Sequence, residues 1–280
     1  MSDSEDGSAH WTSRAHHFVT VDAETCHIPE GIDAVCAVRE RVEAEQGMEI
    51  PITWFIRFQR TWDEYVQIDA ADYFSGPITK AFDGFELGKP QLLRLRKRGD
   101  EIGWHYHAYS YVHRDDLSHE KKVAILGADL AACGAEIRRR YREFEIQSFR
   151  WGWFFVPDYS LFAVLNDVGV RIDASIMPQL AGRKVQKFNV THPVSITDKP
   201  RKIGGTWFVP FARTSLIHDY NMVSHDLGWS AQDEQQATQN REALETQLSA
   251  IANELGAVEG AFLTYEKALA RENAFAADRV

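Results

Sequence analysis

The feature that most constrains the fold is the repeated alternation of short β-rich runs with helix-like patterns along the chain. Apolar residues at helical spacing separate the β-rich runs, as at 32–45, 118–144 and 244–255. Strands that alternate with helices favour a parallel sheet with helices packed on it. We expect strands near residues 17–22, 52–58, 101–107, 148–155, 170–176, 206–212, 221–224 and 261–264.

Seven or eight such units in one chain of 280 residues predict an α/β protein, a distorted TIM-like (β/α)7–8 barrel. No Gly-rich phosphate loop follows the first strand, which counts against a Rossmann domain. Residues 1–15 are expected to be a flexible N-terminal segment, and residues 16–280 a single domain. The aromatic stretch 59–90 has little periodicity and is interpreted as an insertion that shapes a pocket, a lid or a subunit contact.

Composition excludes several classes of partner. With 31 basic and 41 acidic residues the net charge is −10, which argues against nucleic-acid and anionic-membrane partners. We find no apolar run of about 18 residues and no apolar core in the acidic N-terminus, so we expect neither a membrane span nor a secretory signal. The three cysteines form no CxxC pair and are interpreted as reduced thiols of a cytoplasmic protein. A homo-oligomer remains an open alternative.

Polar residues stand at the ends of several expected strands, where barrels of this kind place their sites. Asp22 and Glu24 are two residues apart and would face one cavity, as acid/base groups or as a base beside a metal ligand. Helix capping or simple solvation is the alternative for this pair. His105 and His107 share the same spacing at the end of the third strand, and paired imidazoles there favour metal binding.

Two later strand ends carry further candidates. Arg150 could orient a carboxylate, while Trp151 and Trp153 offer flat faces for a sugar or another planar substrate. The alternative places both tryptophans in the core and the arginine at the surface. His225 could act as a general acid, although the residue taken alone is better interpreted as a loop histidine without a role.

Taken in order, these strings resemble the motifs of the NodB-homology polysaccharide deacetylases, the carbohydrate esterase family four group. The resemblance runs from about Phe18 to Leu269. It rests on FVTVDAET, GDEIGWHYHAY, SFRWGWFF with the following VLNDVG and DASI, MVSHDL, and FLTYEKAL.

The resemblance implies a metal-dependent hydrolase that removes an acyl group, typically acetyl, from an amide. It implies Asp22 as catalytic base, Glu24 and His105 as metal ligands, Arg150 as the partner of the base, and His225 as general acid. The implied cofactor is one divalent ion, Zn²⁺ first, with Co²⁺, Ni²⁺ or Mn²⁺ as alternatives.

The chain departs from the family pattern at three positions. Tyr109 stands where the second metal histidine is usual, so His107 is the expected substitute. Glu24 replaces a more usual aspartate, and Trp151 replaces a proline after the motif arginine. These changes favour a small soluble substrate, such as an N-acetylated amino sugar or a natural-product intermediate, over a polymeric one. Expected substrate contacts are Trp54, Tyr109, Trp151 and Trp153.

Two other functions remain open from the sequence. A urease-type barrel amidohydrolase acting on a cyclic amide also uses an HxH pair, although normally on its first strand. A non-catalytic sugar-binding relative would use the tryptophans and the aromatic insertion without hydrolysing anything. Metal content separates the three functions. The urease-type amidohydrolase would bind two metal ions, the deacetylase one, and the sugar-binding relative none.

Overall fold

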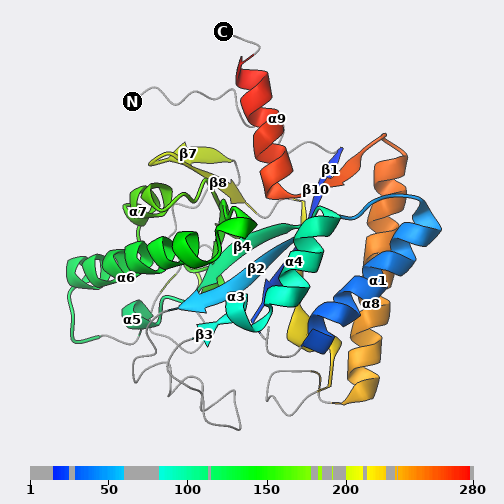
Figure 1. Cartoon of the computed structure of the whole chain (residues 1–280), viewed down its shortest axis with the longest axis horizontal. Helices are drawn as coiled ribbons and strands as arrows, with labels where there is room; N and C mark the ends of the chain where they lie inside the picture. Colours follow the sequence, from blue (N-terminus) through cyan, green and yellow to red (C-terminus); the bar gives the residue numbers. More distant parts are fainter. Residues whose placement is uncertain are drawn as a thin grey trace.

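A computed structural model describes residues 15–24, 29–59, 82–112, 115–177, 182–184, 191, 200–210, 213–224, 231 and 233–277. These residues form an α/β fold, in which one curled mixed sheet makes a half-barrel with helices around it (Figure 1). The strands are β1 (His16–Ala23), β2 (Ile52–Gln59), β3 (Phe82–Asp83), β4 (Glu101–Tyr106), β5 (Ser148–Trp151), β6 (Ile172–Ile176), β7 (Arg201–Ile203), β8 (Thr206–Pro210), β9 (Thr214–His218) and β10 (Ala261–Leu263).

The sheet order is β10-β1-β2-β4-β5-β6-β8-β7, and the path from β10 to β8 is parallel throughout. β9 pairs in parallel with β1, while β3 and β7 pair in antiparallel fashion with β2 and β8. The expected α/β class with parallel strands is therefore confirmed. Complete closure into a seven- or eight-unit barrel stays a prediction, because the described pairings define an open, curled sheet.

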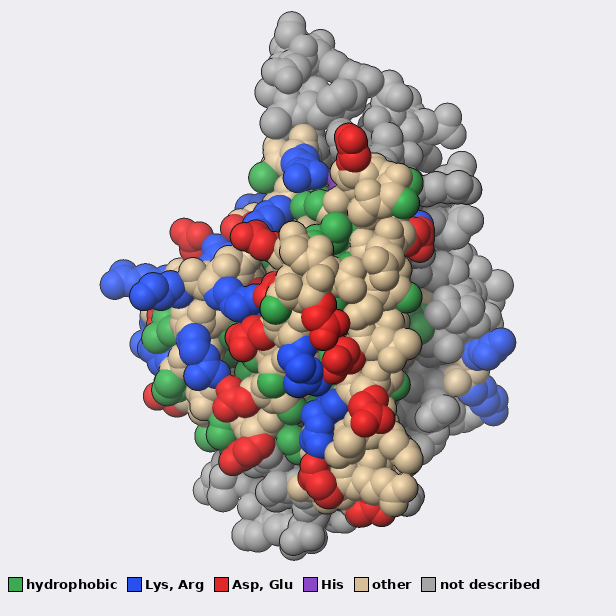
Figure 2. All heavy atoms as spheres, turned by 90° about the vertical axis from the view of Figure 1, so that its right-hand side faces the viewer, with side chains coloured by type: hydrophobic (Ala, Val, Ile, Leu, Met, Phe, Trp, Pro, Cys, Tyr) green, Lys and Arg blue, Asp and Glu red, His purple; other side chains and the backbone are tan. Residues whose placement is uncertain are grey.

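In Figure 1, α1 and α8 lie to the right of the sheet, α6 and α7 lie to the left, and α4 overlaps the sheet in this view. α1 and α8 lie against each other, and Figure 2 shows acidic and basic side chains interspersed on this face. Arg41 and Glu245 join the two helices by a 2.5 Å ion pair. The helices are α1 (Pro29–Gln46), α3 (Gly84–Leu87), α4 (Lys89–Arg98), α5 (Tyr109–Val112), α6 (His119–Arg140), α7 (Leu161–Asp167), α8 (Glu234–Gly256) and α9 (Tyr265–Ala277), with 3-10 turns η2 (Arg142–Phe144), η3 (Gly152–Phe154) and η5 (Asp219–Met222).

Local signals explain several helix ends. The Ser118 side chain accepts a hydrogen bond from the Lys121 amide, as expected for the start of α6. Gly99 ends α4 with φ 102°, a left-handed conformation that glycine adopts without steric cost. Asp233 is the N-cap of α8, and its carboxylate accepts a hydrogen bond from the Gln236 amide. None of the helices described is both long and apolar enough to cross a membrane.

The structure corrects two expected strands and adds one that was not expected. The run at 148–155 leaves the sheet after Trp151 and continues as η3, in which Trp153 and Phe154 adopt positive φ. The expected strand at 221–224 is wrong, because its first two residues belong to η5 and the preceding segment Thr214–His218 forms β9. The segment Arg201–Ile203, for which no strand is expected from the sequence, forms the short strand β7 at the sheet edge.

Tryptophans fill much of the core. Trp54 is fully buried and donates a hydrogen bond from Nε1 to Asp100 Oδ2 at 3.1 Å. Trp151 is also fully buried and packs edge-on against Tyr106 and Phe149. Both side chains therefore pack inside the molecule and stabilise the core. The structure does not support the substrate contacts expected of Trp54 and Trp151.

Candidate metal centre

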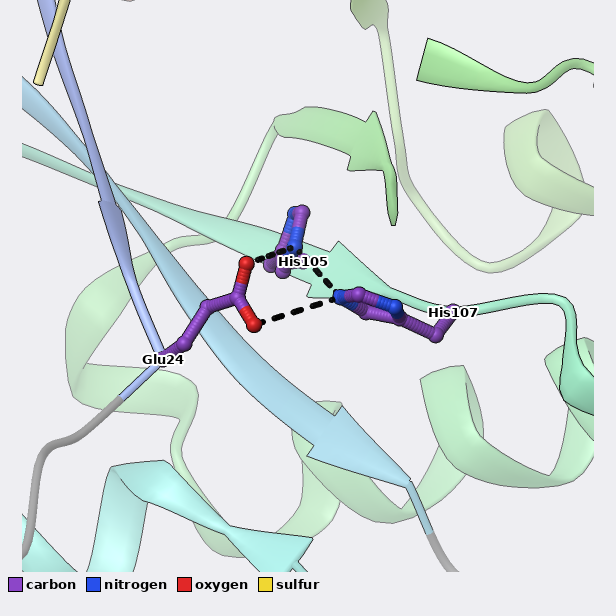
Figure 3. Close-up of side chains that lie close together, drawn as sticks. All are labelled: Glu24, His105 and His107. Carbon is purple, nitrogen blue, oxygen red and sulfur yellow. Dashed lines mark hydrogen bonds and ion pairs between the residues drawn. The ribbon is translucent and has the colours of Figure 1, made fainter. Parts of the chain in front are cut away.

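The neighbouring parallel strands β1, β2 and β4 bring the candidate ligands together at their carboxyl ends. Glu24 follows the last residue of β1, and His107 follows the last residue of β4 by one position. His105 lies within β4 and pairs in register with Arg57 of β2. Because side chains two residues apart share a face of a strand, both imidazoles turn toward the carboxylate. Figure 3 shows the three side chains pointing toward one another.

The three ligand atoms form a compact group. Glu24 Oε1 lies 3.5 Å from His105 Nε2, and Glu24 Oε2 lies 3.5 Å from His107 Nε2. The two Nε2 atoms are 3.0 Å apart, and one donor atom from each residue lies within 4.8 Å of the others. Two ligands about 2.05 Å from a tetrahedral ion are roughly 3.3 Å apart, close to these separations. The group of Glu24, His105 and His107 could therefore hold a metal ion.

The protonation of the group also suits a cation. Burial would raise the pKa of Glu24, but the neighbouring His107 and His105 hold that pKa well below its usual range. Burial lowers the pKa of His107 to about 4, so this imidazole is neutral near pH 7. An ionised carboxylate and a neutral imidazole are the forms that bind metal. One carboxylate and two imidazoles form a donor set that Zn²⁺ and other first-row divalent ions accept.

Close packing fixes the ring of His107. A Cβ atom built on Gly152 would lie 2.5 Å from His107 Cγ, so only a glycine lets η3 approach the imidazole this closely. Tyr109 stacks on the ring at 5.2 Å between centroids, and Trp153 meets it edge-on at 4.5 Å. Gln59 Nε2 donates to the carbonyl oxygen of His107 at 2.9 Å. These contacts set the direction of the His107 imidazole, whose Nε2 also lies 3.0 Å from His105 Nε2.

A second charged pair lies beside this group, with Asp22 on β1, two residues before Glu24, and Arg150 on β5. Arg150 Nη1 donates to Asp22 Oδ1 at 2.6 Å and to Thr20 Oγ1 at 3.1 Å. Arg150 Nε donates to the carbonyl oxygen of Ala174 at 3.0 Å, and the guanidinium carbon lies 4.0 Å from the centroid of the Phe55 ring. Asp22 and Arg150 are both buried. The expected pairing of Asp22 with Arg150 is present in the structure.

Sequence reasoning missed one histidine beside this pair. His218 ends β9, which pairs with β1 so that Asp22 and His218 are register partners. His218 Nε2 lies 3.9 Å from Asp22 Oδ2, and its side chain is 28% exposed, which leaves it open to a substrate. Burial alternates along Thr214–His218 in the structure, but the residues TSLIH do not alternate between apolar and polar, so no local signal in the sequence marks His218. His225, the expected general acid, lies outside the described residues.

The site also contains a positively charged side chain, Arg57, which the sequence analysis does not place there. Arg57 Nη1 lies 3.8 Å from Glu24 Oε2, and the Arg57 side chain is almost fully buried. Arg57 Nη2 donates to the Tyr109 hydroxyl at 2.9 Å, and Arg57 Nε donates to Gln59 Oε1 at 3.3 Å. Tyr109, expected to touch substrate, is thus a buried support for the candidate ligands, whereas Trp153 is only partly buried.

No protein-family model matches the chain, and no match is found among curated proteins. The class that the fold and site define is an α/β protein with a curled mixed sheet and a candidate metal centre at the carboxyl ends of neighbouring strands. Within it, this chain combines one carboxylate, two imidazoles and a buried aspartate–arginine pair.

Proposed function

We propose that this protein is a metal-dependent hydrolase that removes an acyl group, typically acetyl, from an amide of a small soluble substrate. The observation that carries the proposal is the convergence of Glu24, His105 and His107 beside the buried pair of Asp22 and Arg150. Membership of the NodB-homology deacetylases, which the ordered motifs favour, is part of this proposal. A cytoplasmic location is also part of this proposal.

The three ligands Glu24, His105 and His107 would hold one divalent ion, Zn²⁺ first. Such an ion, when bound, polarises an acyl oxygen and lowers the pKa of water near it. The remaining chemistry belongs to the side chains of this chain. Asp22 accepts the proton as water attacks the acyl carbon, and Arg150 holds the carboxylate in the direction that this transfer needs.

The carbon–nitrogen bond must then break with a proton on the departing nitrogen. His218 lies beside Asp22, is partly exposed, and has an imidazole that can donate this proton. The products are a carboxylic acid and a free amine, so the water supplies the hydroxyl group and the two proton transfers balance. Trp153 is partly buried beside His107 and offers a flat surface for the substrate.

Metal binding and acyl release together test the proposal. Purified protein should bind about one equivalent of Zn²⁺ or Co²⁺ by elemental analysis, and a chelator should abolish acetate release from a panel of N-acetylated amino sugars. His105→Ala and Glu24→Gln should lose the ion without unfolding. His16→Ala is the matched control, because His16 lies at the opposite end of β1 and contacts Arg271.

The competing functions give different results in the same assays. A protein that binds no ion, and whose ligand binding survives chelation, would contradict the proposal and favour a non-catalytic sugar-binding role. Two bound ions per chain would favour the urease-type amidohydrolase. Full acetate release by Asp22→Asn would remove the role assigned to this carboxylate.

A further inference from the structure

Arg57 is a buried cation that the proposed reaction does not use. It lies on β2, directly beside His105 in the strand register. Its hydrogen bonds to Tyr109 and Gln59 hold the guanidinium in place, and the guanidinium carbon lies 5.5 Å from the centroid of the Tyr109 ring. This arrangement places a fixed positive charge 3.8 Å from Glu24, a carboxylate that would also face the metal.

The contact between Arg57 and Glu24 acts through charge rather than through hydrogen-bond geometry. At 3.8 Å, Arg57 Nη1 is beyond hydrogen-bond distance of Glu24 Oε2, yet two opposite charges attract strongly at this separation when water is largely excluded. Arg57 therefore neutralises Glu24 without setting its direction. The imidazoles of His105 and His107 lie 3.5 Å from the oxygens of the same carboxylate.

The balance of charge among these four described side chains has a consequence for cations. Two carboxylates, Asp22 and Glu24, lie against two guanidiniums, those of Arg150 and Arg57. The four charges sum to zero before any ion binds. A divalent ion would bring the site to two positive charges, and most of the surrounding side chains are buried. Repulsion from Arg57 must then weaken binding of the ion.

We propose that Arg57 is a built-in counter-charge, which acts through Glu24 to lower the affinity of the centre for divalent cations. Arg57 balances the charge of Glu24 when no ion is bound. This inference rests on the metal-binding role proposed above for Glu24, His105 and His107. It assigns Arg57 to ion affinity, and not to contact with the substrate.

The test is the dissociation constant for Zn²⁺ and Co²⁺, measured by competition with a chromophoric chelator. Arg57→Gln removes the charge but leaves an amide that can reach toward Tyr109, and it should bind the ion at least about tenfold more tightly than the unchanged protein. Arg57→Lys keeps the charge and should remain within about threefold of it. Unchanged or weaker binding in Arg57→Gln would overturn the proposal, because a purely structural arginine can only lose affinity when it is replaced.

Two further measurements keep the outcomes distinct. Arg57→Met, which keeps an apolar stem, repeats the test if Arg57→Gln does not fold by circular dichroism; failure of both to fold would equally reject the counter-charge in favour of a structural role. If the metal-binding role itself is wrong, the unchanged protein and every variant will show no binding at all. Tighter binding confined to the neutral variants supports the counter-charge.

Discussion

Arg150 and Asp22 form a 2.6 Å ion pair in which neither side chain is more than 3% exposed. They come from β5 and β1, which are separated in the sheet by β2 and β4. The curl of the sheet brings the two side chains together, so the ion pair depends on the half-barrel shape of the sheet. Arg150 also donates to Ala174 of β6, which extends the connection to one more strand.

Arg150→Met should cost about 3–5 kcal/mol of unfolding free energy, because it leaves the buried Asp22 carboxylate without its partner. Adding Asp22→Asn to the same chain should restore part of that loss, since the uncompensated charge is then removed. Urea unfolding of the two single variants and the double variant measures the coupling. The control is Arg94→Met, whose partner Asp33 forms an exposed surface pair worth about 0–1 kcal/mol. Equal losses in the two arginine variants would contradict the buried-pair interpretation.

Gly152→Ala should weaken metal binding about 10- to 100-fold, the range seen when groups that orient a ligand are changed. The added methyl group would lie 2.5 Å from the His107 ring and must push the imidazole or the η3 backbone aside. Chelator competition measures the affinity, and thermal unfolding checks for overpacking that costs about 1–3 kcal/mol. Gly256→Ala, at the end of α8 with no atom within 4 Å of the new methyl group, should bind the ion normally. Normal binding in both variants would show that η3 does not position His107.

The raised pKa of Asp173 predicts that the free energy of unfolding depends on pH. Burial raises its pKa to about 7, although hydrogen bonds from Ser175 and the charge of Arg150 act in the opposite direction. The folded protein then holds a proton that the unfolded chain has released above about pH 4, so stability falls as pH rises from about 4 to about 7. The full effect is roughly 4 kcal/mol, from about 1.4 kcal/mol per pH unit. Asp173→Asn should lose this slope, and the test is urea unfolding at several pH values; parallel curves for both proteins would exclude the role of Asp173.

The sequence predicts the candidate ligands because their signal is local. Glu24, His105 and His107 stand at strand ends, where polar residues with a spacing of two interrupt a buried run. The α/β class follows from the same alternation of strands and helices. Barrel closure does not follow, because closure depends on pairings between strands far apart in the chain, and no local pattern encodes them.

The residues that the sequence misses or misplaces share one physical cause, which is that their neighbours come from distant segments. Arg57 reads as an ordinary polar position in a strand, and its burial depends on Tyr109 and Glu24 from two other parts of the chain. Trp153 was expected to continue a strand, but the close approach of Gly152 to His107 coincides with a turn into positive φ. Trp54 and Trp151 carry no local mark that separates a core tryptophan from a binding one.

His218 and His225 are the two candidates for the proton donor, and the two assignments predict opposite results for the same substitution. His218 is the register partner of Asp22 and lies 3.9 Å from it, so His218→Gln should lower kcat about 100- to 10,000-fold, the range typical of general acid–base groups. His225, expected from the sequence to be the general acid, should then tolerate the same change with a loss of less than about tenfold. Acetate release at saturating substrate measures kcat, and metal content checks that both variants retain the ion. A loss confined to His225→Gln would restore the sequence-based assignment, because a donor must reach the departing nitrogen and not merely lie near Asp22.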